Sequence, residues 1–128
     1  MSKYVILIMV VLALAACGSS VDNDTPVGPG KPGLLQVDNI EIQIAESFPP
    51  QVRVQVSGTL PDGCTSLSEI RQEREDNTIT VTMTTWRLTD AMCIQVIEPV
   101  VETIQLQGDF PPGEYIVRVN DVEQTFWI

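Results

Sequence analysis

The segment GEYIVRVNDVEQTFWI, residues 113–128, decides the fold class. Tyr115, Val117 and Val119 occupy every second position, so one face of an extended chain carries large apolar side chains. The Asn-Asp pair at 120–121 is a tight-turn signal, after which the chain returns as a second extended run. The segment therefore predicts a β-hairpin that buries one of its faces.

The same period of two recurs over most of residues 34–128 and indicates further strands. Phe48-Pro49-Pro50 is expected to end the first strand, and Gly58 to Gly63 to turn the chain after the second. Seven or eight short strands separated by turns predict an all-β fold, an antiparallel sandwich. The apolar residues expected to face inward are Ile40, Ile42, Ile44, Val52, Val54, Val56, Ile79, Val81, Met83, Ile94, Val96, Ile104 and Leu106.

The segment SLSEIRQERED, Ser66 to Asp76, is compatible with two structures. Ser66 and Glu69 have the spacing of a capping box, which would begin a short charged helix. However, Asp76-Asn77 is a turn signal directly before a clear strand, which indicates a hairpin. We predict a strand for this segment.

The N-terminus has the pattern of an export signal. Lys3 precedes an apolar run over residues 4–16, which is too short for a membrane-spanning helix of about 20 residues. We therefore predict a signal peptide over residues 1–16. The alternative is an ordinary secretory signal cleaved near Ala16, with Cys17 present by chance.

The end of that segment, Leu14-Ala15-Ala16-Cys17, resembles the lipobox of bacterial lipoproteins. The resemblance implies that the Cys17 thiol takes a diacylglycerol, that the signal is cleaved before it, and that the new amino group is acylated with a chain such as palmitate. Two acyl chains are enough for stable anchoring. Gly18, in place of the aspartate that retains lipoproteins at an inner membrane, favours the outer membrane or cell surface of a bacterial cell envelope.

Residues 17–33 are expected to be a flexible linker, because Gly, Pro, Ser and Asp predominate and no apolar period is present. The folded domain is then expected at 34–128. One domain of this size can bury roughly 65% of the surface of its unfolded chain, which is enough for one core.

A second resemblance concerns the fold. Pro112 to Val119 is similar to the penultimate strand of immunoglobulin-like domains, in which a G-x-Y turn precedes the strand and the tyrosine, here Tyr115, closes a corner. Trp86 does not lie midway between the cysteines, as it would in antibody domains. The segments LPDGC and CIQVIEP also resemble small bacterial lipoprotein domains of an uncharacterised family, from which no mechanism can be transferred.

The cysteine count fits an exported protein. With Cys17 lipidated, Cys64 and Cys93 remain as an even pair, and we predict a disulfide between them. Closing this loop would stabilise the fold by roughly 3.6 kcal/mol on the chain-entropy model. The alternative is a redox pair, but no C-x-x-C arrangement accompanies these residues.

Charge and composition exclude several functions. The formal net charge of −10 argues against a nucleic-acid partner, and the absence of histidine removes Ser-His-Asp catalysis and the usual zinc sites. Carboxylate-pair chemistry would use Asp62, Asp90, Asp109 or Glu114, yet turns favour acids for local hydrogen bonds. We therefore expect no enzyme activity, no cofactor and no metal.

Five residues are candidates for a binding surface. Thr80, Thr82 and Thr84 form a flat row, Trp127 points opposite Phe126, and Phe110 lies in an apolar loop. Each has a structural alternative, as an outer strand position, an edge cover or a plug of the sandwich end. We predict a membrane-anchored, non-catalytic module that binds an envelope protein or surface ligand. Alternatives are a surface protease inhibitor that presents this loop, and a purely structural envelope subunit.

Overall fold

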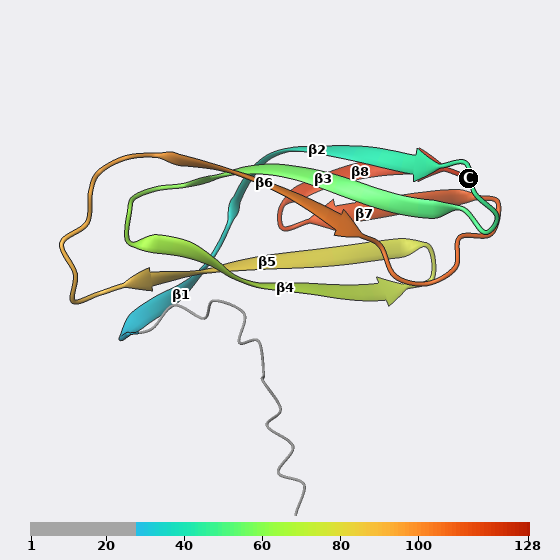
Figure 1. Ribbon diagram of the computed structural model, residues 1–128. Helices are drawn as coiled ribbons and strands as arrows, with labels where there is room; N and C mark the ends of the chain where they lie inside the picture. The colour runs from blue at the N-terminus through green and yellow to red at the C-terminus, as the bar shows by residue number, and fades with distance from the viewer. Residues whose placement is uncertain (1–27) are drawn as a thin grey trace, which may run out of the picture.

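The computed structural model describes residues 28–128, and these form eight β-strands packed as two layers (Figure 1). The predicted signal peptide, Cys17 and most of the predicted linker lie outside the described residues. In this part of the chain there is no helix of the length and apolarity required to span a membrane. The described chain thus has the predicted all-β sandwich fold.

The larger sheet is built around β5. It contains β1 (Gly30–Leu34), β4 (Thr65–Glu75), β5 (Thr78–Leu88), β7 (Glu114–Val119) and β8 (Val122–Trp127). β4 pairs with one edge of β5, and β1 and β7 share the other edge. β5 and β7 run parallel, which is the exception to the antiparallel arrangement that we expected.

The smaller sheet has β3 (Gln51–Leu60) in its middle, between β2 (Gln36–Ala45) and β6 (Glu98–Gln105). The chain passes from the larger sheet to the smaller one at Leu35, which is buried between β1 and β2. Figure 1 shows the two layers lying over one another, with the loops gathered at two opposite ends.

Asn120 holds the junction where β1 and β7 meet along β5. Its side-chain amide donates hydrogen bonds to the carbonyl oxygens of Leu35 (2.7 Å) and Met83 (3.1 Å), and its Oδ1 accepts one from the Met83 backbone N–H (2.9 Å). Its φ of 51° lies in the left-handed region, which asparagine tolerates in tight turns. The predicted turn at 120–121 therefore also joins three strands.

The core consists of the inward-facing residues of both sheets. Val52, Val54 and Val56 have no exposed surface, as expected from their alternation. Ile44 departs from the expectation and is 42% exposed, because β2 is an edge strand. The buried core residues are Leu35, Val37, Ile40, Val52, Val54, Val56, Leu60, Ile79, Val81, Met83, Ile104, Leu106, Phe110, Tyr115, Val117, Val119 and Phe126.

Two local predictions are confirmed. Residues 65–75 form β4, and the turn that follows contains Asp76 at a φ of 53°, so the hairpin is correct and the helix is not formed. The Tyr115 hydroxyl donates a hydrogen bond to the Pro111 carbonyl oxygen (2.5 Å), which closes the corner expected of an immunoglobulin-like domain.

The strand expected at Ile94 and Val96 is absent. Residues 89–97 form an irregular loop in which these two side chains are 71% and 50% exposed. The cause is the length of the neighbouring strand: β3 ends at Leu60, which pairs with Glu98, so nothing remains to pair with the residues before Glu98. Alternation alone did not reveal that the partner strand was missing.

Two glycine positions also correct our boundaries. β1 begins at Gly30, inside the predicted linker, where a Cβ atom would collide with the Trp86 ring and lie 2.5 Å from the Arg87 carbonyl oxygen. Gly58 lies within β3 and not in a turn. Glycine is required there, because a Cβ atom would come within 2.6 Å of the Gln36 carbonyl oxygen. Both glycines permit close approach of neighbouring strands.

Candidate functional site

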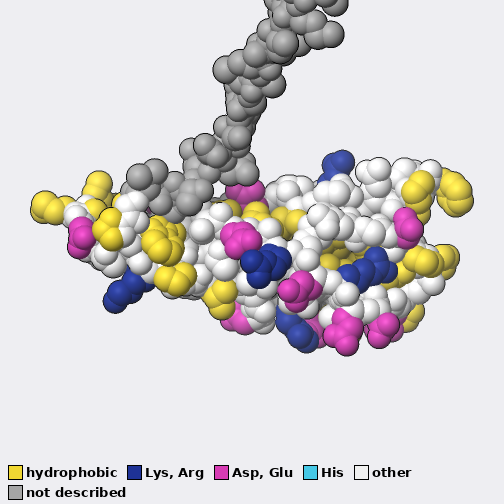
Figure 2. All heavy atoms as spheres, turned by 90° about the horizontal axis from the view of Figure 1, so that it is seen from below, with side chains coloured by type: hydrophobic (Ala, Val, Ile, Leu, Met, Phe, Trp, Pro, Cys, Tyr) yellow, Lys and Arg dark blue, Asp and Glu magenta, His cyan; other side chains and the backbone are white. Residues whose placement is uncertain are grey.

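Exposed apolar side chains gather at the two ends of the sandwich. We call the end with Gly28–Gly30 and the loops 61–64 and 89–97 the proximal end, because the described chain begins there. The opposite end, with the loops 46–50 and 106–113, is the distal end. Figure 2 shows hydrophobic side chains at both ends of this elongated body and charged side chains concentrated between them.

The distal end carries a shallow apolar cleft of about 410 Å³, which we call the proline cleft. The tripeptide Phe-Pro-Pro occurs twice in the sequence, and the fold brings both copies to this one end. Nearly the whole lining is therefore apolar, with one carboxylate at the rim. The lining residues are Phe48, Pro49, Pro50, Asp109, Phe110, Pro111, Pro112 and Ile128.

The two phenylalanines have opposite environments. Phe48, at a cis peptide bond with Pro49, is fully exposed, whereas Phe110 is only 3% exposed. From the sequence, Phe110 was a candidate contact residue, whereas Phe48 was expected only to end a strand. The repeated tripeptide was the signal that could have drawn attention to Phe48. Phe110 is not an exposed loop tip: its buried ring plugs the end of the sandwich, as the structural alternative for this residue predicted.

Packing around Phe110 explains its burial. Its ring lies 5.3 Å from that of Tyr115 in an edge-to-face arrangement and 6.1 Å from that of Phe126. The Arg74 guanidinium sits 4.8 Å from the centre of the Phe110 ring and donates a hydrogen bond to the Asp109 carbonyl oxygen (2.7 Å). The second Phe-Pro-Pro copy is thereby held by the Tyr115 and Phe126 rings and by the Arg74 guanidinium, and it forms a fixed part of the cleft lining.

The other candidate residues lie apart from the cleft floor. Trp127 is 66% exposed at the end of β8, as its alternation with Phe126 suggested. Thr80 and Thr82 are half-buried and line an open depression beside Asn120. Thr84 has a structural task, because its hydroxyl accepts a hydrogen bond from the Glu69 backbone N–H at a bulge of β4 (3.1 Å). The structure therefore does not unite the five candidates in one surface.

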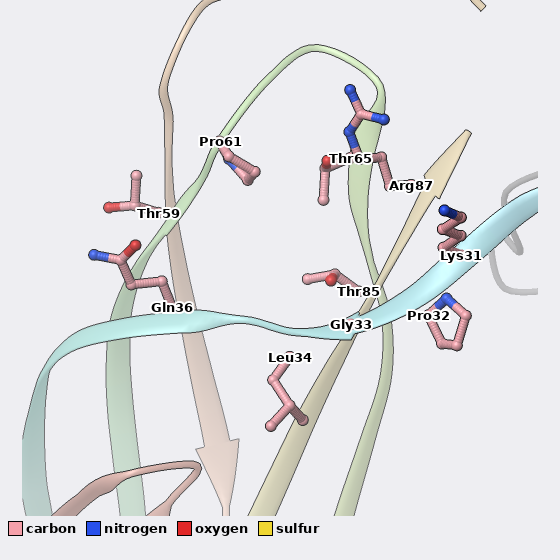
Figure 3. Close-up of a pocket in the computed structure, with 10 residues that line it drawn as sticks. All are labelled: Lys31, Pro32, Gly33, Leu34, Gln36, Thr59, Pro61, Thr65, Thr85 and Arg87. Atoms are coloured by element: carbon pink, nitrogen blue, oxygen red, sulfur yellow. The ribbon is translucent and has the colours of Figure 1, made fainter. Parts of the chain in front are cut away.

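A polar cavity of about 290 Å³ lies between the sheets near the proximal end (Figure 3). Lys31 and Arg87 are its cations, and Thr59, Thr65 and Thr85 contribute hydroxyl groups. Most of these groups already have partners within the protein: the Thr59 hydroxyl donates to Asp38, and Thr65 and Arg87 both donate to Asp62. Three of the five polar groups of the cavity therefore form hydrogen bonds to carboxylates of the protein itself.

Asp62 is the buried carboxylate of this region. It accepts hydrogen bonds from Arg87 Nε (2.7 Å), the Thr65 hydroxyl (2.8 Å) and the Cys64 backbone N–H (3.0 Å). These bonds, that from Arg87 above all, lower the pKa of the Asp62 carboxyl below its ordinary value of 3.8, although burial opposes the change. Of the four acids considered for catalysis, Asp62 is therefore an ionised group that organises the turn between β3 and β4.

The predicted disulfide is present beside Asp62. Cys64 and Cys93 are bonded, with 5.2 Å between their Cα atoms, and join the β3–β4 turn to the loop 89–97. Asp62 and the two sulfurs lie close enough to suggest a metal-binding group. The sulfurs are bonded to each other and do not provide thiolates, so this group is structural.

The loop that the disulfide fixes carries four exposed apolar side chains. Met92 is fully exposed, and Ile94, Val96 and Ile97 are 71%, 50% and 70% exposed. The Gly63 backbone N–H donates a hydrogen bond to the Ile94 carbonyl oxygen (2.8 Å), a second attachment of this loop to the β3–β4 turn. This surface was not expected from the sequence, because the alternation of Ile94 and Val96 predicted a buried strand.

Comparisons with known proteins identify the family. A family model described as "ORF11 beta-sandwich domain" matches residues 54–128. In Herpetosiphon aurantiacus, an "Uncharacterized 10.2 kDa protein in HgiCIIM 5'region" is 44% identical over 91 residues, which are 71% of this chain and 97% of that protein. Two further proteins of that organism, described as "Uncharacterized 10.2 kDa protein" in the HgiBIM and HgiEIM 5' regions, are each 50% identical over 79 residues, covering 62% of this chain and 96% of each protein. No solved structure matches the chain. The chain belongs to the ORF11 β-sandwich domain family.

Proposed function

We propose that the chain is a lipid-anchored protein of the bacterial cell envelope that binds a partner protein at the proline cleft and performs no catalysis. The single observation that carries the binding proposal is the fully exposed Phe48 ring above a wall of prolines. The ring and the prolines form one contiguous exposed apolar surface, and such a surface is typical of a binding site. The cleft lies at the end opposite to the beginning of the described chain, where a partner has access.

The chemistry of the cleft favours a protein segment with apolar and basic side chains. Proline rings and Phe48 provide rigid apolar contacts that cost little conformational entropy on binding. Asp109 lines the cleft, Glu46 belongs to the same loop as Phe48, and Glu114 is the first residue of β7, so acids outnumber the cation at this end of the described chain, Arg74. A cationic segment would be attracted by this charge and by the net charge of −10.

Two observations support the proposal of a lipid anchor: the lipobox resemblance and the number of cysteines. The chain has three cysteines, and the disulfide accounts for Cys64 and Cys93, which leaves Cys17 as the residue for lipidation. Gly18 favours the outer membrane or cell surface as the final location. The prediction is that Cys17→Ser moves the protein from the membrane fraction to the soluble one. Mass spectrometry of the N-terminal peptide would show acyl groups on Cys17 of the unmodified chain.

The structure favours the two alternative functions, a protease inhibitor and a purely structural subunit, less than binding at the cleft. An inhibitor that inserts the loop 110–113 into a protease cleft would need an accessible Phe110, and this ring is buried. A purely structural subunit would not require an exposed Phe48. We therefore place the partner at the cleft formed by both loops.

The experiment is site-specific photo-crosslinking in the intact envelope. A photoreactive phenylalanine analogue replaces Phe48 in the full chain, and a matched control carries it at Val101, which is 59% exposed on β6 away from the cleft. We expect one adduct from position 48 that saturates with expression level and weakens in high salt, and none from position 101. Equal adducts from both positions, or none from position 48, would refute binding at the cleft.

A further inference from the structure

We infer that the apolar loop at the proximal end, Met92–Ile97, docks onto the lipid surface and orients the domain on its membrane. This inference rests on the proposed lipid anchor and adds a second membrane contact to it. Residues 91–97 contain no charged side chain, and four of them are apolar and largely exposed. A lipid surface is a partner that such a segment fits.

The position of the loop relative to the anchor supports a lipid partner. The Thr89 backbone N–H and hydroxyl both donate to the Pro29 carbonyl oxygen, at 3.1 and 3.2 Å, so the loop starts beside the first described residues. Gly28 follows Cys17 by eleven residues, which limits the reach from the anchored cysteine to about 40 Å. The chain enters the domain at the proximal end, so the path from the anchored cysteine to this end is shorter than the path to the distal end. Figure 1 shows β1 and the loop between β5 and β6 at this same end of the sandwich.

The shape of the loop favours lipid over a protein partner. Its apolar side chains protrude, with Met92 fully exposed, and none of the four lines the small hollow at this end, which is formed by Gly28, Pro29, Leu88, Asp90 and Ala91. A protein partner would need pockets shaped to receive separate protruding side chains. A fluid acyl boundary accepts them without such complementarity.

The disulfide fixes the position of the loop backbone and thereby the direction of its apolar side chains. Cys93 lies between Met92 and Ile94 and is bonded to Cys64, and the Gly63–Ile94 hydrogen bond anchors the same stretch. The side chains on either side of the bond are thus held outward without the ordering cost of a free loop. Because the loop backbone is irregular, it can enter only the boundary between headgroups and acyl chains, where water still satisfies its polar groups.

The charges around the loop set the expected lipid dependence. Asp90 and Glu98 flank it, and Lys31 and Arg87 lie at the same end, so no excess of positive charge attracts anionic lipids. We therefore expect docking through apolar contact, with little dependence on salt. Phosphatidylcholine vesicles are the suitable probe, because they carry no net charge.

The test measures quenching of tryptophan fluorescence by brominated acyl chains. The full chain, acylated at Cys17, is reconstituted in phosphatidylcholine vesicles as the Ile97→Trp variant and, as the matched control, the Phe48→Trp variant. Both positions are highly exposed, at opposite ends of the domain. The signal of the parent chain, with Trp86 and Trp127, is subtracted. Circular dichroism of each variant confirms the fold.

We expect the tryptophan introduced at position 97 to be quenched several-fold more than that at position 48. Equal or absent quenching in an acylated protein would overturn the docking of the loop and leave the anchor standing. Emission at position 97 that responds to protein concentration but not to bromine would assign the loop to a second copy of the chain, which also overturns the inference. An N-terminal peptide without acyl groups would overturn the anchor and the inference that rests on it.

Discussion

At the distal end three aromatic rings and a guanidinium hold the loop 106–113 in place, whereas at the proximal end a disulfide and a buried carboxylate hold the loop 89–97 and the turn between β3 and β4. Tyr115 and Phe126 stack on each other, Phe110 packs against both at an angle, and the Arg74 guanidinium covers the Phe110 ring. The proximal loop, by contrast, has few buried contacts of its own and depends on Cys64–Cys93. The loop 89–97 thus depends on a covalent bond and a backbone hydrogen bond to the β3–β4 turn, whereas side-chain packing holds the loop 106–113. The two ends should therefore respond to different perturbations.

The largest effect is expected at the distal end, from Phe110→Ala. This substitution removes a ring that is 3% exposed and leaves a cavity beneath Arg74 and Tyr115, so the free energy of unfolding should fall by about 3–5 kcal/mol. Urea denaturation followed by circular dichroism measures it. Phe48→Ala is the matched control from the identical tripeptide. A loss below about 1 kcal/mol for Phe110→Ala would show that the aromatic cluster does not hold this end.

The next effect is expected at the proximal end, from the double substitution Cys64→Ser with Cys93→Ser. Opening this loop should lower the free energy of unfolding by about 3.6 kcal/mol on the chain-entropy model. A reducing agent should have a similar effect on the unmodified chain and none on the double variant. Hydrogen exchange should rise in residues 89–97 while the loop 106–113 keeps its protection. Equal loosening of both ends would contradict the division of roles.

Acid should also distinguish the two ends, through Asp62. Because its native pKa is lowered, the ionised carboxyl stabilises the fold at pH values above the unfolded-state pKa of about 3.8. That contribution is lost as the pH falls through the lowered native value. We expect the stability of the unmodified chain to decline more steeply in this acidic range than that of Asp62→Asn, which has no carboxyl to protonate. Parallel pH profiles of the two proteins would count against this role of Asp62.

The two Phe-Pro-Pro copies show how far sequence analysis can reach. Alternation predicted the buried faces of β3, β5 and β7, and the tyrosine corner was predicted from a local pattern, because each depends on residues within a single strand or turn. The burial of Phe110 depends on Arg74, which is distant in sequence and meets it only in the fold. The prediction that Ile94 is buried was wrong for the same reason: its exposure depends on where β3, a strand distant in sequence, ends. The local sequence therefore predicts which face of a strand points inward. It does not predict whether a segment distant in sequence lies against a given side chain and buries it.

The smallest stability change is expected for Phe48→Ala, and it sharpens the comparison most. The ring is fully exposed and its neighbours in the cleft are prolines, so its removal should change the free energy of unfolding by less than about 0.5 kcal/mol. The same tripeptide would then contribute stability in one copy and almost none in the other. A residue without a stabilising role on a rigid apolar surface is free to serve a partner, so Phe48→Ala should abolish the photo-crosslinks formed from a probe at Pro50, while Val101→Ala should not. A marked loss of stability in Phe48→Ala would mean that the ring supports the fold, and the cleft would lose its best candidate for a binding residue.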